Sequence, residues 1–189
     1  MGKFITVTGI IFILLSFAGC STMKGTYVSI TPLANTGFDP DHYATLGFAY
    51  TPDSDGGKLL KKELSAVFIE EQFKIISEKV ELDAIQKTGI VYNKEVTIAD
   101  AQKLGKIMKA KAMIIVNKTD FAGNVKASYI SIDIVDTYGG VLVSAVYKGG
   151  ENPDDINRAA RSIVYRIQTE NMKMQNKSEH HDESIVLPK

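Results

Sequence analysis

Cysteine and histidine are scarce in this sequence, and neither sign of charge is in excess. The chain of 189 residues holds a single cysteine, Cys20, which excludes an intramolecular disulfide. Its three histidines are His42, His180 and His181, so few imidazoles are present for metal binding or base catalysis. Basic and acidic side chains number 22 each, so nothing favours nucleic acid, which binds a clustered basic surface.

Residues 1–19 have the layout of a secretory signal peptide. Lys3 is the only charged side chain before an apolar run, Phe4–Phe17, and small residues then precede Cys20. A membrane-spanning helix needs roughly 20 predominantly apolar residues, whereas this run is shorter and polar residues follow it closely. The sequence therefore predicts a lipoprotein-type or ordinary signal peptide at 1–19 rather than a permanent transmembrane helix.

The residues that end at Cys20 resemble a bacterial lipobox. In that motif, here Phe17-Ala18-Gly19-Cys20, the thiol receives a diacylglyceryl group and the cysteine becomes the first residue after cleavage. Phe17 stands where Leu is usual, although the position stays bulky and apolar. The resemblance implies lipidation of Cys20 and at least two acyl chains, which anchor a protein stably. Ser21 stands where Asp signals inner-membrane retention, so the resemblance favours the periplasmic face of the outer membrane.

Cys20 could also be an incidental residue or a catalytic thiol. An ordinary cleaved signal peptide could carry a cysteine at this position without lipid. A catalytic thiol needs a pKa lowered by a nearby base or helix terminus, and the flanking residues promise neither.

The remaining chain, residues 20–189, is long enough for one domain with a sizeable core. Residues 20–42 mix Ser, Thr, Gly, Asn and Pro without a sustained period, which predicts a flexible tether. Residues 173–189 are polar and aperiodic, which predicts a disordered tail. A single α/β periplasmic domain is therefore expected at 43–172.

The apolar spacing within that domain alternates between the periods of strands and helices. Strands are expected at 43–50, 73–78, 112–116, 127–135 and 141–148. Four helices are expected: one that begins near Lys58, one at 79–87, one that begins after Thr97 and one that begins after Asn152. The order β-α-β-α-α-β-β-β-α predicts an α/β layered domain with a mixed sheet packed against helices.

Several local patterns sharpen this expectation. Residues 112–116 are continuously apolar, which predicts a strand in the middle of the sheet. Thr97 and Asp100 match a capping box at a helix start. The residues DTYGG at 136–140 favour a tight turn in an antiparallel hairpin. The apolar stripe of the first helix leaves Lys61 facing water.

Several short motifs of packing residues occur within residues 57–149. They are Leu82 and Ile85, Thr88-Gly89 and Leu104-Gly105-Lys106 within 57–116, and an aspartate-containing turn before a Val-rich strand within 132–149. With these motifs the chain resembles the lipoprotein family of the curli-secretion protein CsgG, which includes the flagellar lipoprotein FlgO and the LpoB-type activators of penicillin-binding proteins. The resemblance implies the periplasmic fold of that family and no catalytic residues.

Two departures from the family pattern are visible. Ala112-Met113 stands where Ala-Asp is common before the buried strand. Pore-forming members carry long amphipathic segments beside these strands, whereas residues 117–124 are only NKTDFAGN. Two lipid-spanning strands would need about 9–11 residues each, so this segment is too short to supply them.

Strands 127–135 and 141–148 approach the length of a membrane hairpin. Ile130, Ile132 and Ile134 alternate with polar residues and would form its lipid face. Such a use would remove two strands from the soluble sheet, so we expect the isoleucines to contact helices. Asp133 then lies on the opposite face, exposed or in contact with a partner.

The residues DSDGGK at 53–58 precede a helix, where a phosphate-binding loop would lie. A Walker loop requires Gly at Pro52 and Ser or Thr at Leu59, and the acidic residues would repel phosphate. A calcium loop requires Gly at Lys58 and Glu at Leu64. A solvated loop before the helix is therefore expected.

Residues 180–183, HHDE, offer ligands for a transition metal but lie in the predicted tail, where no scaffold would hold them. No Ser-His or Cys-His nucleophile pattern is legible in the sequence. We expect no catalytic residues, no cofactor and no metal site, and the binding residues stay unassigned.

These observations favour a non-catalytic lipoprotein, anchored to the outer membrane by its N-terminal lipid, with its domain in the periplasm. Its partner would be another envelope protein or a second copy. The family resemblance implies secretion, flagellar assembly or peptidoglycan synthesis. One alternative is an envelope enzyme or small-molecule-binding lipoprotein, which a pocket of converging polar groups would favour. Another is a subunit of a CsgG-like oligomeric secretion channel.

Replacing Cys20 by Ala tests the anchor directly. We expect Cys20→Ala to abolish labelling by radioactive palmitate and to release the protein from the membrane fraction, because the thiol that carries the lipid is gone. Retention of both signals in the variant would refute lipidation at this residue.

Overall fold

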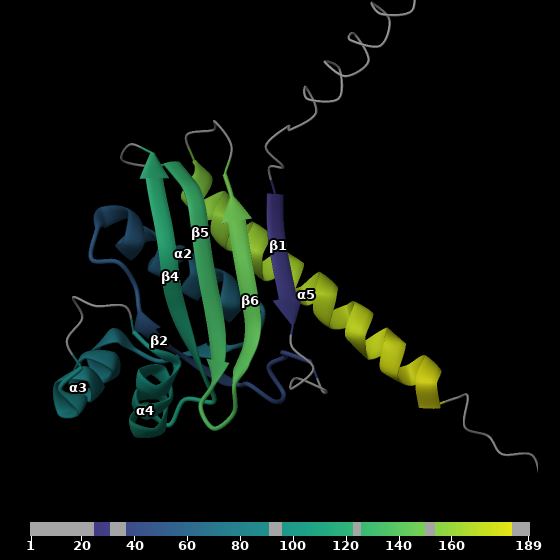
Figure 1. The fold of residues 1–189 in the computed structure, drawn as a ribbon, viewed down its shortest axis with the longest axis horizontal. Helices are drawn as coiled ribbons and strands as arrows, with labels where there is room; N and C mark the ends of the chain where they lie inside the picture. Colours follow the sequence, from purple (N-terminus) through teal and green to yellow (C-terminus); the bar gives the residue numbers. More distant parts are fainter. Residues whose placement is uncertain (1–24, 31–36, 91–95, 123–125, 150–153, 183–189) are drawn as a thin grey trace, which may run out of the picture.

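One mixed sheet with helices on both faces forms the body of the protein (Figure 1). The structure, a computed structural model, describes residues 25–30, 37–90, 96–122, 126–149 and 154–182. Within these ranges six strands lie in the order β1-β6-β5-β4-β2-β3, accompanied by four helices. The strands are β1 (Gly25–Ile30), β2 (Thr45–Tyr50), β3 (Lys74–Ile75), β4 (Ala112–Ala122), β5 (Lys126–Asp136) and β6 (Val141–Lys148). The helices are α2 (Asp55–Glu70), α3 (Glu78–Thr88), α4 (Ile98–Met108) and α5 (Asp155–Asp182).

The predicted α/β layered class is confirmed, and one strand is added to the predicted order. From β2 to α5 the elements follow β-α-β-α-α-β-β-β-α, and β1 precedes them. β2 pairs in parallel with β3 and β4. The pairs β4–β5, β5–β6 and β1–β6 are antiparallel, so the sheet is mixed. β3 is shorter than the predicted strand 73–78.

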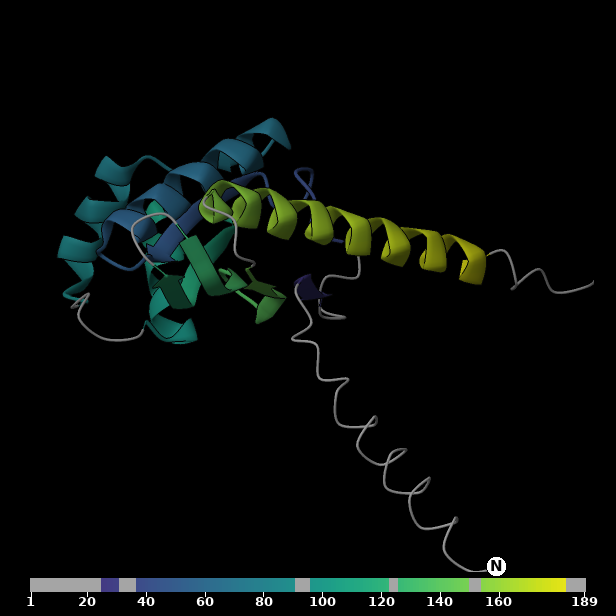
Figure 2. The same cartoon turned by 90° about the horizontal axis from the view of Figure 1, so that it is seen from above.

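The two faces of the sheet bury separate apolar cores. α2 and α5 lie along one face (Figure 2), where Leu60, Ile132 and Ile163 are fully buried together. α3 and α4 cover part of the other face, where Leu104 and Met113 are fully buried. Burial of several such side chains, each contributing about 1.5–3 kcal/mol, gives the sheet its main stabilisation.

β4 occupies the middle of the sheet, as its apolar run predicts. It lies between β5 and β2. Ala112, Ile114 and Val116 enter the core under α2 and α5, whereas Met113 and Ile115 enter the core under α3 and α4. A strand covered on both faces cannot alternate apolar with polar residues, which explains the continuous run.

The isoleucines of β5 contact helices rather than lipid. Ile130, Ile132 and Ile134 are fully buried in the core under α2 and α5. The predicted hairpin of β5 and β6 is also confirmed. In its turn, Asp136 accepts the backbone N–H groups of Tyr138 and Gly139 at 2.6 and 2.7 Å.

The predicted capping box of α4 is present. Thr97 Oγ1 accepts the backbone N–H of Asp100, and Asp100 Oδ2 accepts the backbone N–H of Thr97, both at 3.2 Å. At the start of α2, Ser54 Oγ accepts the backbone N–H of Gly57 at 3.1 Å. Such caps satisfy helix N–H groups that have no partner within the helix, so they fix where α2 and α4 begin.

The tether predicted at 20–42 is wrong for residues 25–30 and 37–42. β1 pairs with β6 from Gly25 opposite Lys148 to Ile30 opposite Val143. The region 37–42 joins the fold through Phe38, which is fully buried. Residues 20–24 and 31–36 lie outside the described residues. An edge strand of six residues gives little local signal, because its stability comes from pairing with a distant strand.

Asn171 of α5 holds the chain that leads into β2. Its side chain accepts the backbone N–H of Phe38 at 2.9 Å and donates to the Phe38 carbonyl at 3.3 Å. Gly37, with φ of +80°, lies so close that an added Cβ would be 2.2 Å from Asn171 Oδ1. A side chain at position 37 would therefore displace this contact.

The disordered tail predicted at 173–189 is wrong for residues 173–182, because α5 continues to Asp182. The helix extends beyond the sheet (Figure 1). Glu170 pairs with Lys173 at 2.9 Å and with Arg166 at 3.1 Å, spacings that support a helix without a core. Residues 183–189 lie outside the described residues.

Candidate functional site

A cavity of about 290 Å³ opens beside the carboxyl end of β2. Its wall includes Phe48, Tyr50 and Thr51 from β2 and the following loop, Lys58 and Lys61 from α2, and Glu78, Glu81 and Leu82 from α3. Ligand sites of α/β proteins commonly lie at the carboxyl ends of strands. This is therefore the place to look for converging polar groups.

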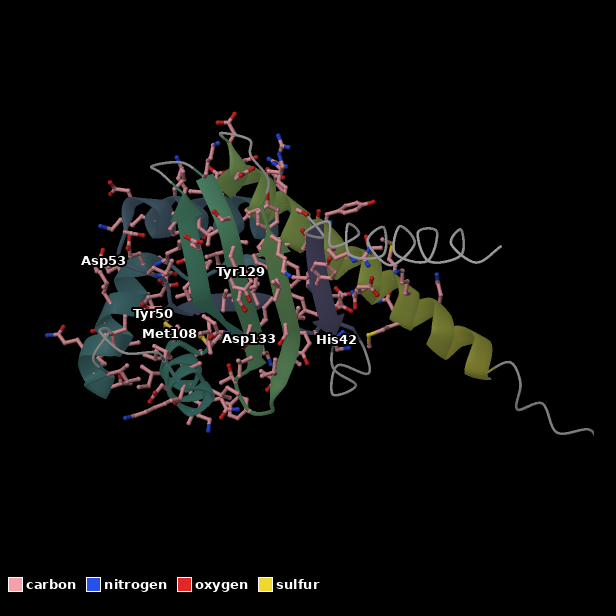
Figure 3. All side chains as sticks on the ribbon, turned by 45° about the horizontal axis from the view of Figure 1, so that its top comes forward. His42, Tyr50, Asp53, Met108, Tyr129 and Asp133 are labelled. Atoms are coloured by element: carbon pink, nitrogen blue, oxygen red, sulfur yellow. The ribbon has the colours of Figure 1, made fainter. Side chains whose placement is uncertain are left out.

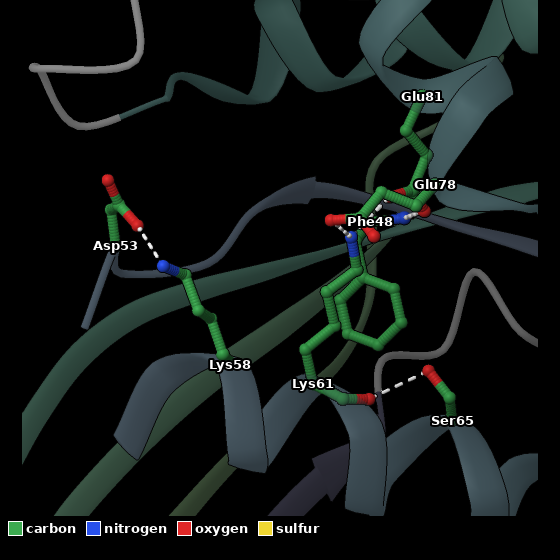
Figure 4. A network of polar contacts seen from close by, with 7 residues as sticks. All are labelled: Phe48, Asp53, Lys58, Lys61, Ser65, Glu78 and Glu81. Atoms are coloured by element: carbon green, nitrogen blue, oxygen red, sulfur yellow. Dashed lines mark hydrogen bonds and ion pairs between the residues drawn. The ribbon is translucent and has the colours of Figure 1, made fainter. Parts of the chain in front are cut away.

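The deepest polar group of the cavity wall is the carboxylate of Glu81 (Figure 4). The side chain is 3% exposed. Glu81 Oε1 accepts the backbone N–H of Phe48 at 2.9 Å, and Glu81 Oε2 lies 2.6 Å from Lys61 Nζ. Lys61 Nζ also lies 5.5 Å from the ring centroid of Phe48. Both oxygens of the carboxylate are thus engaged within the protein.

The shortness of β3 explains why Glu81 is needed there. The pairing of β2 with β3 reaches Leu46 opposite Ile75 and goes no further. Beyond it, the N–H of Phe48 faces α3 instead of a strand, and Glu81 supplies the acceptor. An unpaired buried N–H would cost about 1–3 kcal/mol, so this contact is structural.

A second ion pair lies at the mouth of the cavity. Lys58 Nζ is 3.0 Å from Asp53 Oδ1, and both side chains are exposed. The hydrogen bond to Asp53, helped by its charge, raises the pKa of Lys58, so this lysine stays protonated at neutral pH. Thr51 Oγ1 is buried in the wall without a hydrogen-bond partner. Both lysines of the cavity wall are therefore paired with carboxylates.

The loop 53–58 acts as a helix start, as predicted. Its two glycines serve packing, because a Cβ on Gly57 would lie 2.0 Å from the Pro52 carbonyl oxygen and one on Gly56 would lie 2.9 Å from the Phe121 ring. The loop therefore needs no bound phosphate to explain its glycines.

A second candidate is the side of the sheet that faces away from α2 and α5. We name this surface the open sheet face. In Figure 1 its strands lie in front of α2 and α5, and α3 and α4 cover one end only. Its side chains are Tyr27, Asn117, Tyr129, Ser131, Asp133, Ser144, Val146 and Lys148, all exposed or half-buried. No described helix lies over this area (Figures 1 and 2).

Asp133 organises the middle of the open sheet face. Asn117 Nδ2 donates to its Oδ2 at 2.6 Å, and Ser144 Oγ donates to its Oδ1. Figure 3 labels Asp133 and Tyr129 on this side of the sheet. Lys148 Nζ lies 5.9 Å from the ring centroid of Tyr27. The face thus combines fixed polar groups with aromatic rings, a composition common in protein interfaces.

The described residues considered as site candidates in the sequence do not come together in the structure. Asp133 lies opposite the core isoleucines, as predicted, and Cys20 lies outside the described residues. His42 bonds to Asp39, with Nδ1 and Oδ1 3.0 Å apart. His180 and His181 belong to α5, and no metal-binding cluster occurs among the described side chains. None of the described helices is both long and apolar enough to cross a bilayer.

Sequence reasoning missed the pairing of Lys61 with Glu81. Lys61 is 24% exposed and points to Glu81 instead of water. In α3 the buried side chains are Glu81 and Ala84, whereas Leu82 is 60% exposed. The search for an apolar stripe cannot identify a helix face that buries an acidic side chain. The burial of Glu81 could have been inferred only from its basic partner, Lys61, on another helix.

Comparisons with known proteins give matches to structures only. No protein-family model matches the sequence, and no curated protein sequence matches it. The LpoB C-terminal domain from Salmonella enterica is similar, with 16% identity, 59% of this chain and 84% of that chain covered, and a TM-score of 0.42. Lipoprotein GNA1162 from Neisseria meningitidis has 15% identity, coverages of 66% and 95%, and a TM-score of 0.44. The PelC dodecamer from Paraburkholderia phytofirmans has 13% identity, coverages of 77% and 95%, and a TM-score of 0.43. Such low identities and scores assign no function.

Removal of the Glu81 carboxylate tests whether the cavity is a structural joint. We expect Glu81→Ala to lower the free energy of unfolding by about 2 kcal/mol or more, because it leaves the Phe48 N–H unpaired and Lys61 without its partner. Glu81→Gln should cost less, since its amide oxygen can still accept the Phe48 N–H. Equilibrium unfolding in urea measures both.

Glu78→Ala is the matched control on the same helix. Glu78 is 75% exposed and lies 3.8 Å from Lys61, so its loss should change the free energy of unfolding by less than about 0.5 kcal/mol. A gain in stability for Glu81→Ala would contradict the structural role and indicate a group kept for ligand binding.

Proposed function

We propose that this chain is a non-catalytic, lipid-anchored protein of the bacterial cell envelope that binds another envelope protein through the open sheet face. The observation that carries the proposal is a sheet whose strands are fully packed on one side and expose ordered polar and aromatic side chains on the other. An antiparallel sheet commonly leaves one face in water, so it is the fixed polar groups and aromatic rings on this face that make it a candidate contact surface.

The order of these side chains supports binding rather than simple solvation. Asp133 is held by Asn117 and Ser144, so its carboxylate is fixed before any partner arrives. Tyr27 and Tyr129 add aromatic area at low conformational cost. A preorganised face loses less entropy on association than a mobile one.

The cavity beside β2 supports an enzyme or small-molecule binder poorly. Its volume of about 290 Å³ lies at the lower limit of ligand pockets. Glu81 and Lys61 contact each other and the Phe48 backbone, and Lys58 contacts Asp53. A catalytic or ligand-orienting group would need a free functional atom that points into the cavity. Thr51 Oγ1 is buried in the wall without a hydrogen-bond partner, but it is a neutral hydroxyl that would need a neighbouring base to act as a nucleophile.

The anchor is proposed from the residues that end at Cys20. Their lipobox-like pattern supports lipidation, and Ser21 supports the periplasmic face of the outer membrane as the location. The resemblance of residues 57–116 to CsgG-like lipoproteins supports a role in secretion, flagellar assembly or peptidoglycan synthesis. The solved structures named above include a lipoprotein, and their likeness adds no weight to a particular system.

Site-specific photocrosslinking in cells tests the proposed face. We expect a photoreactive amino acid at Ser131, on the open sheet face, to crosslink to one specific envelope protein identified by mass spectrometry. The same probe at Lys62, exposed on α2, is the matched control and should give no such product. Asp133→Ala, which removes the carboxylate fixed in the middle of the open sheet face, should reduce the Ser131 product several-fold without unfolding the domain.

Three results would contradict the proposed face. Equal crosslinking from Ser131 and Lys62 would show no preference for this surface. A product composed of two copies of this chain would identify self-association instead of another protein. Recovery of no partner, together with turnover of a cell-wall substrate by the purified protein, would favour the enzyme.

A further inference from the structure

We infer that the end of the sheet where β1 begins is held against the membrane, with the lipid headgroups as the surface it contacts. The inference rests on the proposed lipidation of Cys20. It goes beyond that proposal, because an anchor alone does not say how the domain is oriented.

The chain between the proposed lipid and the described fold is short. Only residues 21–24 separate Cys20 from Gly25, where β1 begins. A fully extended chain spans at most about 3.3–3.6 Å per residue, so Gly25 lies within roughly 18 Å of Cys20. That reach is shorter than a small domain is wide.

Gly25 cannot move separately from the domain. β1 pairs with β6 over six residues, and Thr26 bonds to Ser162 of α5. Gly25 lies opposite Lys148, and Lys148 lies opposite Tyr129 of β5. An anchor that restrains Gly25 therefore also restrains the adjoining ends of β1, β6 and β5.

The other end of the sheet lies a full strand length from Gly25. β6 runs over eight residues from Val141 to Lys148 and rises about 3.3 Å per residue, which places its start roughly 23 Å from Lys148. Tyr138, in the turn before β6, is 79% exposed at that far end. A short anchor at one end and a long strand behind it hold Tyr138 away from the bilayer.

The chemistry of the near end suits a headgroup layer. Lys148 and Tyr27 are both exposed, with the ammonium 5.9 Å from the ring centroid. At such an interface, long basic and aromatic side chains can bury their apolar parts while their polar ends stay in water. Asp120, exposed and opposite Tyr129, offsets part of the positive charge, so the short anchor sets the orientation and electrostatics adds little.

The single cysteine makes the test practical. After lipidation of Cys20 an introduced cysteine is the chain's one free thiol, so a donor fluorophore can be placed at Lys148→Cys or, as the matched far-end variant, at Tyr138→Cys. The lipidated full chain is reconstituted into phosphatidylethanolamine and phosphatidylglycerol vesicles that carry an acceptor on the headgroups. We expect energy transfer to be several-fold more efficient from position 148 than from position 138.

A third variant checks the cause. Insertion of about 20 Gly and Ser residues between Cys20 and Gly25 makes the leader a flexible coil with a spread of about 5–6 Å × √n, and the contrast between the two positions should then largely disappear. Equal transfer from both positions in the chain of natural leader length, or an unchanged contrast after the insertion, would overturn the inference.

The same preparation separates the two proposals. If the intact mass shows no acyl chains and the protein does not float with the vesicles, the anchor itself is wrong. If the protein is acylated and floats, but the two positions transfer equally, the anchor stands and the orientation is wrong.

Discussion

Pairing of β1 with β6 fixes where the folded domain begins relative to Cys20. β1 carries no charged residue and no proline, and its edge contact with β6 is reinforced by Thr26 reaching Ser162 of α5. Because strand pairing is directional, the start of β1 is locked beside Lys148 at one end of the sheet. Residues 25–30 are therefore part of the fold rather than a spacer.

Two sets of polar groups divide the surface of the sheet. Near β2, the buried Glu81 satisfies the Phe48 N–H and pairs with Lys61, so charge is used to join α2, α3 and the sheet edge. On the open sheet face, Asp133 is held by Asn117 and Ser144 but remains half-buried. The first set is complete within the chain, whereas the second presents ordered groups outward. This difference is the reason that we propose a binding role for the open sheet face.

The sequence predicted elements whose signals are local and missed those whose stability is distant. The continuous run 112–116, the Thr97–Asp100 capping box and the turn after Asp136 follow from neighbouring residues, and all three are confirmed. β1 depends on β6, far along the chain, and Glu81 depends on a lysine of another helix, so neither leaves a periodic pattern. Beyond its core contacts, α5 is stabilised by side chains with high helix propensity and by ion pairs within the helix. An apolar stripe does not indicate this part of the helix.

Amide hydrogen exchange in β1 of the full membrane-bound protein tests this arrangement most directly. If β1 is paired with β6, exchange within Gly25–Ile30 should be at least ~100-fold slower than in an unstructured peptide, a local opening free energy of about 2.7 kcal/mol. Exchange of these amides at the unstructured rate, beside protected amides in β5, would show that residues 25–30 are a tether after all. The domain would then stand free of the membrane.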